Sequence, residues 1–225
     1  VNKKNSNKKL KISVFQFDLG LNLMHDQTNY NDPSTKAFLN VPVENQNKDL
    51  FSLRQNKSVN VNIYPVLANL YLLKNANQKI SIYTGIGMQI FNFRFNKPIE
   101  FQNVTQPEVV MSNLHLSKNK LSVMYGTIPI SLLMKSRLAG NTWLVYGFGV
   151  MGGVNMSTWT KQKSYENGKV KNHDMFNLDR FNTTLTAEFG IDDRFRIFGT
   201  YQLNSMYKDG LVQNPYSIGI RLLSL

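Results

Sequence analysis

The stretch WLVYGFGVMGGVNMSTWT, residues 143–160, alternates between two kinds of side chain. Even positions from Leu144 to Met156 are mostly bulky and apolar, whereas odd positions from Gly147 to Ser157 are mostly glycine or small polar residues. A period of two indicates a β-strand with two different faces. Strands of soluble sandwiches avoid glycine, because glycine packs against nothing. The pattern instead predicts a strand whose small face lines a narrow interior and whose apolar face contacts lipid.

The same alternation recurs along most of the chain, and no long segment has a convincing helical period. We predict eight strands, at residues 10–24, 58–72, 80–95, 120–135, 143–160, 179–190, 194–206 and 215–225. In the fourth strand the apolar residues change from odd to even positions near Pro129. A bulge at this proline would produce such a change of phase.

The connections between these strands alternate strictly in length. Long polar connections lie near 25–57, 96–119, 159–178 and 207–214, and short ones near 73–79, 136–141 and 191–193. This layout is typical of an outer-membrane barrel, with short periplasmic turns and long extracellular loops. We therefore predict an all-β protein, an eight-stranded antiparallel up-and-down transmembrane β-barrel. Residues 10–225 would form this one domain, and residues 1–9 a flexible basic N-terminal arm.

Aromatic residues gather near the predicted strand ends, where two interfacial girdles would place them. Toward the short turns lie Tyr71, Trp143, Phe189, Phe195 and Tyr216, and toward the long loops lie Phe91, Phe93, Phe95, Trp159, Phe181 and Tyr207. Ordinary enrichment of aromatic residues in strands is the alternative explanation.

Five charged residues are assigned to the inward polar face of the predicted strands, namely Asp18, Arg94, Glu188, Arg196 and Arg221. Buried charges must pair. Glu188 and Arg196 can lie directly across from one another if residues 191–193 close a hairpin. Asp18 and Arg221 become neighbours only if the first strand pairs with the last. We expect a network of ion pairs that plugs the lumen, with a selective pore lined by these charges as the alternative.

The formal net charge of +12 raises the question of an anionic partner. The basic residues do not gather on one helix face, and no aromatic RNA-binding motif accompanies them, so we expect no nucleic-acid partner. Lys161, Lys163, Lys169 and Lys171 lie in or beside a long loop and are expected to contact lipopolysaccharide or an acidic partner. The chain has no cysteine, which excludes disulfides and cysteine-ligated metals.

The sequence gives little sign of catalysis. A hydrolase would need a nucleophile or water activated by a histidine that a carboxylate holds. His25 and His173 each stand beside an aspartate in sequence, which points the two side chains in different directions on a strand, and His115 lies in a long loop. Neither HExxH, GxSxG nor a phosphate-binding loop occurs. We expect no catalytic residue, cofactor or metal site.

The strand sequences GTIPISLLMKS (126–136), WLVYGFGVMGGV (143–154) and YSIGIRLLSL (216–225) resemble those of the PorT-like small outer-membrane barrels of Bacteroidota. This resemblance implies an outer-membrane location and a role in secretion or envelope assembly.

We expect a non-enzymatic accessory or scaffold subunit of an envelope complex that serves secretion, outer-membrane protein assembly or uptake. Its partners would be outer-membrane lipid and lipopolysaccharide, and other outer-membrane or periplasmic proteins. The alternatives are a small channel, a lipid-modifying or proteolytic surface enzyme, and a soluble lipocalin-like binder whose bulky faces point inward.

Overall fold

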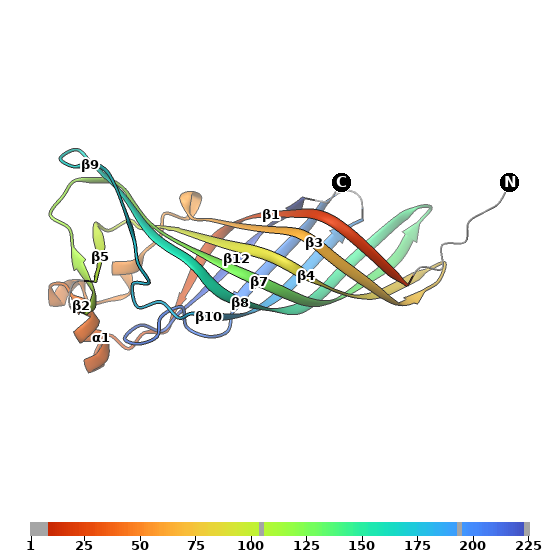
Figure 1. Cartoon of the computed structure of the whole chain (residues 1–225), viewed down its shortest axis with the longest axis horizontal. Helices are drawn as coiled ribbons and strands as arrows, with labels where there is room; N and C mark the ends of the chain where they lie inside the picture. The colour runs from red at the N-terminus through yellow and green to blue at the C-terminus, as the bar shows by residue number, and fades with distance from the viewer. Residues whose placement is uncertain (1–8, 104–105, 193–194, 223–225) are drawn as a thin grey trace.

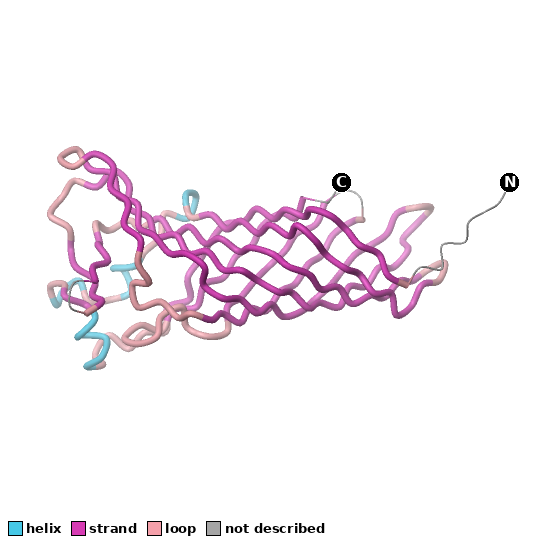
Figure 2. Tube along the Cα trace, viewed as in Figure 1, coloured by secondary structure: helices cyan, strands magenta, loops and turns pink. Residues whose placement is uncertain are grey.

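The computed structural model of the chain describes residues 9–103, 106–192 and 195–222 (Figures 1 and 2). Eight long antiparallel strands follow one another around a single lumen, and the last pairs with the first. They are β1 (Leu10–Asp26), β3 (Val59–Lys74), β4 (Gln78–Arg94), β7 (Leu116–Ala139), β8 (Thr142–Ser164), β10 (Phe181–Ile191), β11 (Phe195–Gln202) and β12 (Gln213–Leu222). The sheet therefore closes on itself, as predicted.

Each of these eight strands matches one predicted strand, but the prediction of only eight strands was wrong, because the described residues contain twelve. Three of the others, β2 (Leu39–Asn40), β5 (Ile99–Asn103) and β6 (Pro107–Met111), form a separate small sheet. The fourth, β9 (Gly168–His173), continues the ladder of β8 as a hairpin. The long connections carry apolar residues of their own, and burying these residues favours folded structure over open loops.

Within the described residues, helical structure is confined to one long connection. The helix α1 (Pro33–Phe38) begins with Pro33 in its first turn, and the Asp32 side chain accepts a hydrogen bond from the backbone N–H of Ser34. Three short 3₁₀ helices follow, at Val43–Asn45, Lys48–Phe51 and Gln55–Lys57. Among the described residues, no helix has the length and apolar character needed to cross a membrane.

The two ends of the barrel differ in structure. Figure 1 shows the small sheet and α1 at one end, with the tight turns between β3 and β4 and between β7 and β8 at the other. We call the first the cap end and the second the turn end. The cap consists of residues 27–57, 95–115, 174–180 and 203–212, apart from 104–105. Residues 1–8 of the predicted basic arm and residues 223–225 of the predicted last strand lie outside the described residues.

The bulky apolar side chains of the ring point outward, and all eight strands contribute to the resulting belt. Exposed members include Leu19, Val66, Ile86, Ile130, Phe148, Leu185, Ile197 and Ile220. Phe148 is 59% exposed, for example, whereas Val145 on the inward face of the same strand is fully buried. The lipocalin-like alternative requires the opposite orientation, so the structure contradicts it.

The inward glycines allow a sharply curved sheet. A Cβ atom on Gly149 would collide with the carbonyl oxygen of Ile130 and with Ser131 on the adjacent β7. In contrast, a Cβ atom on the outward Gly152 would meet nothing within 4 Å. Small closed barrels leave little interior room, and glycine on the concave face lets neighbouring strands approach. This explains the one-sided glycines of residues 143–160.

The expected change of phase at Pro129 was wrong. Odd-numbered residues of β7 face inward along its length, so that Leu121, Val123 and Tyr125 are fully buried while Ile128 and Ile130 are exposed. Near the cap end, the inward face of β7 is apolar because it packs on the apolar side chains of the cap. Nearer the turn end, the outward face is the apolar one, so the apolar residues change from odd to even positions. Of the register shifts between β7 and β8, the one nearest Pro129 is instead in β8, where Met156 is an extra residue between the partners of Met124 and Tyr125.

Candidate functional site

The turn-end half of the lumen is built around Arg221 on β12. Its guanidinium holds both carboxylate oxygens of Asp18 on β1, with an Nε–Oδ1 distance of 2.9 Å and an Nη2–Oδ2 distance of 2.9 Å. Its Nη1 atom also donates to Oε1 of Glu188 at 2.6 Å. The hydroxyl of Tyr83 donates to the same carboxylate oxygen at 3.0 Å. These groups are almost fully buried, and bidentate geometry of this kind makes strong, directional pairs.

The network continues from Glu188 toward the turn end. Arg196 Nη1 lies 3.1 Å from Glu188 Oε2, and Arg196 Nη2 lies 2.6 Å from Asp192 Oδ1. Lys135 donates to the other oxygen of Asp192. The six charged groups thus alternate in sign, in the order Asp18, Arg221, Glu188, Arg196, Asp192, Lys135. Three carboxylates balance three cations, so each buried charge has a partner of opposite sign.

Strand register explains which of these residues meet. Asp18 lies directly opposite Arg221, because β1 pairs with β12. Arg196 also lies directly opposite Arg221, which would repel it without the Glu188 carboxylate between them. The expectation that Glu188 and Arg196 lie directly across was wrong in detail. Glu188 pairs with Phe198 and Arg196 with Gly190, so their ion pair is diagonal across the hairpin.

Arg94 does not belong to this network, so its assignment to the lumen was wrong. In β4 the odd residues Phe91 and Phe93 face inward, and the alternation places Arg94 on the outer face. Its Nη2 atom donates to the carbonyl oxygen of Ser117, 2.9 Å away on the neighbouring strand. The structure brings the other four predicted lumen residues together. It adds Asp192, Lys135 and Tyr83, of which the two charged residues lie at or near the short turns.

Further layers of side chains fill the lumen toward the cap. Next to the ion network lie Tyr64 and Met151, with the tyrosine hydroxyl 3.6 Å from the methionine sulfur. A polar layer follows, in which Asn182 Nδ2 donates to Gln89 Oε1 at 3.1 Å. Buried members of this layer also include Asn60, Asn62, Thr184 and Gln202. The near-zero exposure of these inward groups shows that side chains fill this middle part of the lumen.

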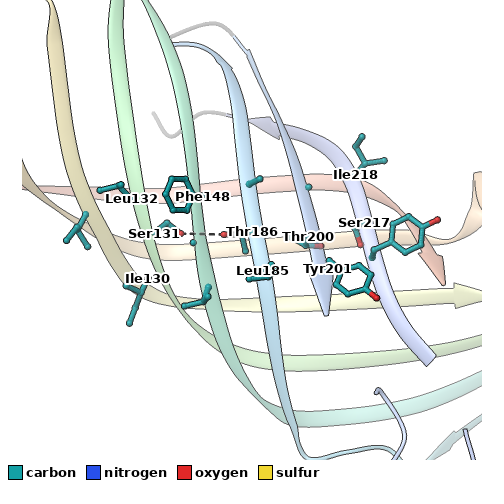
Figure 3. A pocket seen from close by; sticks show the side chains of 16 residues that line it. Ile130, Ser131, Leu132, Phe148, Leu185, Thr186, Thr200, Tyr201, Ser217 and Ile218 are labelled. Carbon is teal, nitrogen blue, oxygen red and sulfur yellow. Dashed lines mark hydrogen bonds between the residues drawn. The ribbon is translucent and has the colours of Figure 1, made fainter. Parts of the chain in front are cut away.

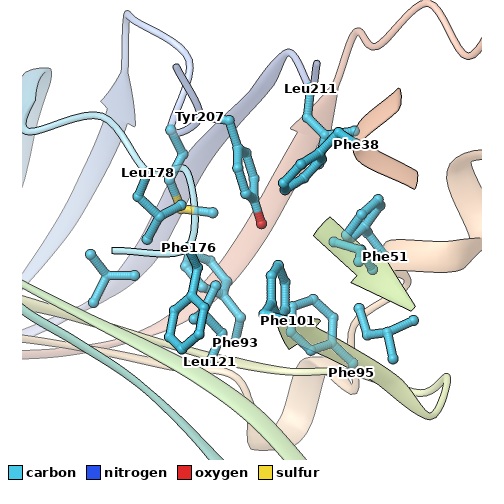
Figure 4. Packing of buried hydrophobic residues seen from close by; sticks show 14 of the residues in the cluster. Phe38, Phe51, Phe93, Phe95, Phe101, Leu121, Phe176, Leu178, Tyr207 and Leu211 are labelled. Atoms are coloured by element: carbon cyan, nitrogen blue, oxygen red, sulfur yellow. The ribbon is translucent and has the colours of Figure 1, made fainter. Parts of the chain in front are cut away.

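A large apolar core closes the cap end of the barrel (Figure 4). Side chains from the cap, including Phe38, Phe51, Phe101 and Phe176, pack together on residues that line the barrel mouth. The mouth contributes Phe91, Phe93, Leu121, Val123 and Tyr125, all of them fully or almost fully buried. The cap is therefore joined to the barrel by one continuous hydrophobic core.

This core corrects the predicted aromatic girdle at the long-loop end. Phe91, Phe93, Phe95 and Tyr207 are buried inside and do not face an interface. The phase of β4 carries the signal, since Gly87 and Gln89 have the small or polar character of an inward face and the three phenylalanines continue the same odd series. The contributions of Phe38, Phe51, Phe101 and Phe176 come from segments that sequence reasoning treated as loops.

The outer wall carries a shallow apolar depression (Figure 3). Phe148, Leu132, Tyr201 and Ile218 are among the residues that surround it. Within it, the small residues Ala187 and Gly199 lie opposite each other on β10 and β11. A Cβ atom on Gly199 would have no neighbour nearer than 3.9 Å. The belt is therefore locally hollowed at β10 and β11.

The three histidines lie apart from one another. His25 Nδ1 lies 2.9 Å from the Tyr201 hydroxyl, and His173 stacks at a tilt on Trp159. His115 Nδ1 lies 2.8 Å from Glu166 Oε1 at the exposed β8–β9 hairpin. The hydrogen bond from the His115 side chain lowers the pKa of Glu166 to about 2. Within the described ranges, no cluster of three or more His, Asp or Glu side chains could hold a metal ion.

The four predicted contact lysines lie on one projecting hairpin. Lys161 and Lys163 are in β8, directly opposite Lys171 and Lys169 of β9. All four are on the outer face of the hairpin, away from the cap core.

The geometry defines a class: a closed eight-stranded barrel with an apolar outer belt, a filled and charged lumen, and a folded cap. No protein-family model matches the chain, and no curated protein matches it. Among solved structures, the crystal structure of Ail, the attachment invasion locus protein of Yersinia pestis, is similar at 10% sequence identity and a TM-score of 0.29. The alignment covers 94% of this chain and 98% of that chain. At this TM-score the likeness supports no conclusion about function.

Proposed function

We propose that this chain is an integral barrel of a bacterial outer membrane, with its cap outside the cell and its short turns in the periplasm. The observation that carries the proposal is the continuous apolar belt around a closed ring. A sheet can reside in hydrocarbon only when it has no unpaired edge, because each unsatisfied backbone group there costs several kcal/mol. Such an extended apolar surface would be an aggregation hazard in water.

Within that membrane, we assign the chain a non-enzymatic accessory or scaffold role in an envelope complex. Layers of buried side chains leave the lumen unsuited to conduction, which disfavours the channel alternative. Within the described residues, the histidines contact Tyr201, Glu166 and Trp159, and none of them contacts a serine or threonine hydroxyl, which disfavours a serine-type or threonine-type surface hydrolase. What the molecule offers to partners is a folded cap and a hollowed outer wall. Membership of the PorT-like family, with a role in secretion, outer-membrane protein assembly or uptake, is part of this proposal.

Membrane residence can be tested with Phe148→Arg. An arginine near the midplane of the belt should block insertion into vesicles or reduce the free energy of unfolding by about 2–4 kcal/mol. Tyr165→Arg is the matched control, because Tyr165 is 96% exposed at the β8–β9 hairpin, beyond the belt. Insertion is measured by co-sedimentation with vesicles and by the gel mobility shift of folded barrels. Equal tolerance of both substitutions would contradict the proposed orientation.

The scaffold role can be tested by crosslinking, because the chain has no cysteine of its own. Ala187→Cys places a single thiol in the wall depression, and Val43→Cys places one on the exposed surface of the cap. Crosslinking in native membranes should yield a defined adduct with another envelope protein from at least one position. Val170→Cys on β9 serves as a comparison site away from both surfaces. Absence of adducts from both test positions would count against a scaffold.

A further inference from the structure

The cap-end parts of β7, β8 and β9 form a projecting arm. Together with the end of β4 beside it, this arm carries an ordered array of positive charge on its outer face. Strand register places Arg94, Lys120, Lys161 and Lys171 side by side in one row across four strands. A second row places Lys118, Lys163 and Lys169 side by side across three strands. We call these seven residues the basic grid. Three of them, Arg94, Lys118 and Lys120, were not among the predicted contact lysines.

The grid is electrostatically unfavourable on its own. Lys118, Lys161, Arg94 and Lys171 all repel the ammonium group of Lys120. Like charges directly opposite on neighbouring strands destabilise a sheet. In the described part of the chain, none of the seven forms a salt bridge. A ligand that carries several negative charges at a comparable spacing would therefore reduce the repulsion between these cations.

The inner face of the same arm is occupied, and the grid lies on the opposite face, away from the cap. Asn119 and Gln162 point inward and donate to the carbonyl oxygen of Ile99 on β5, so this face packs on the cap. Strands lie roughly 4.8 Å apart, and residues on one face of a strand recur about every 6.6 Å. Adjacent grid cations can therefore contact different oxygens of one phosphate group, or two phosphates of one headgroup.

The position of the grid relative to the belt indicates which kind of ligand would fit it. On the turn-end side of the first row, Trp159 faces outward because the extra residue Met156 shifts the phase of β8. Lys171 Nζ lies 4.9 Å from the centre of its ring. Outward Met156 is 62% exposed and continues the apolar belt. An apolar band, then an outward tryptophan, then cations is the order in which a bilayer presents acyl chains, interface and phosphates.

We propose that the basic grid binds the phosphate groups of an anionic lipid headgroup of the lipid A type, held in the leaflet that surrounds the cap end. The proposal rests on the membrane location proposed above. The lipid lies with its acyl chains against β7 and β8 and its phosphates across the two rows. Trp159 marks the depth at which acyl chain gives way to headgroup.

The test uses full-length protein in neutral detergent and measures its affinity for bisphosphorylated lipid A. Replacing Lys120, Lys161 and Lys171 together by Gln should weaken binding by about tenfold or more. The control replaces Lys36, Lys57 and Lys208 together by Gln, which removes the same charge from the cap, and it should stay within about twofold of wild type. Replacing Lys120, Lys161 and Lys171 together by Arg keeps the positive charge, and this variant should bind lipid A about as tightly as the wild type. Raising the salt concentration should shrink the difference between wild type and the first variant.

Several outcomes would overturn the assignment. An equal loss of lipid A affinity in both triple variants would show that only the net charge of the protein matters. Equally tight binding of dephosphorylated lipid A, or of inorganic phosphate alone, would show that a membrane phosphate headgroup is not what the grid recognises. Unchanged lipid affinity in the grid variant would also refute it, and a simultaneous loss of binding to an acidic peptide would assign the grid to a protein instead. The gel mobility shift is recorded for every variant, so that a failure of the barrel to insert is distinguished from a failure of the grid.

Discussion

At the scale of single residues, Glu188 holds two arginines that would otherwise repel each other. Arg196 and Arg221 lie directly opposite on β11 and β12, and Glu188 contacts both. Breaking a buried pair from one side leaves an uncompensated charge, which typically costs about 3–5 kcal/mol. Loss of the carboxylate should therefore be more damaging than loss of Arg196 alone, because two buried cations are then left with less compensation.

This difference can be measured with a double-mutant cycle of Glu188→Gln and Arg196→Gln. The free energy of unfolding in urea should show favourable coupling on the order of 1 kcal/mol. Glu188→Gln should be the more destabilising single change. Lys135→Gln at the end of the network should cost less than either. Additive effects would break the proposed pairing, and a milder effect of Glu188→Gln would show that the arginines do not depend on it.

At the scale of elements, the cap is the part of the fold that was not predicted from the sequence. The small sheet β2–β6–β5 and the helix α1 have few residues each, so their stability depends on the shared apolar core. Phe101 on β5 packs against Phe95 and Phe176 with ring centres 5.8 and 5.9 Å away. These three rings link β5 to segments on both sides of the barrel mouth.

Phe101→Ala should loosen the cap without opening the ring. Truncating a buried phenylalanine typically reduces stability by about 3–5 kcal/mol. Here the reduction should fall on the free energy of local unfolding of the cap. Hydrogen exchange at residues 99–103 and 107–111 should become faster, while β8 and β10 keep the protection of the wild type. Val43→Ala is the matched control, because Val43 is 80% exposed on the cap surface. Equal loss of protection in the barrel strands would show that cap and ring unfold together.

The strands of the ring were predictable because each outward face alternates with a small or polar inward face, as Phe148 and Gly147 do. The short turns and the Asp18–Arg221 pair were also predictable from the sequence, since both depend only on strand order and on closure of the ring. The cap did not follow, because period-two reasoning assigns no fold to segments such as 96–119 that lack a long periodic run. Arg94 was misplaced at a strand end, where one step of phase exchanges lumen and surface.

At the scale of the whole molecule, the ion network, the Tyr64–Met151 layer and the cap core obstruct the lumen in series. Each barrier alone hinders ions, the first by fixed paired charges and the last by an apolar seal. We therefore expect no steady conductance when the wild-type protein is reconstituted in a planar bilayer. Insertion is verified on the same sample by vesicle co-sedimentation, and an open porin serves as the positive control. A stable open channel would favour the pore alternative.

Closure of the ring between β1 and β12 has a consequence for biogenesis. The Asp18–Arg221 pair joins residues 203 positions apart in the chain. Until β12 has paired with β1, one side of β1 has no strand to bond with, and any earlier intermediate is an open sheet. The unpaired backbone groups of such an edge are costly in hydrocarbon, so we expect insertion into the bilayer to accompany closure of the ring.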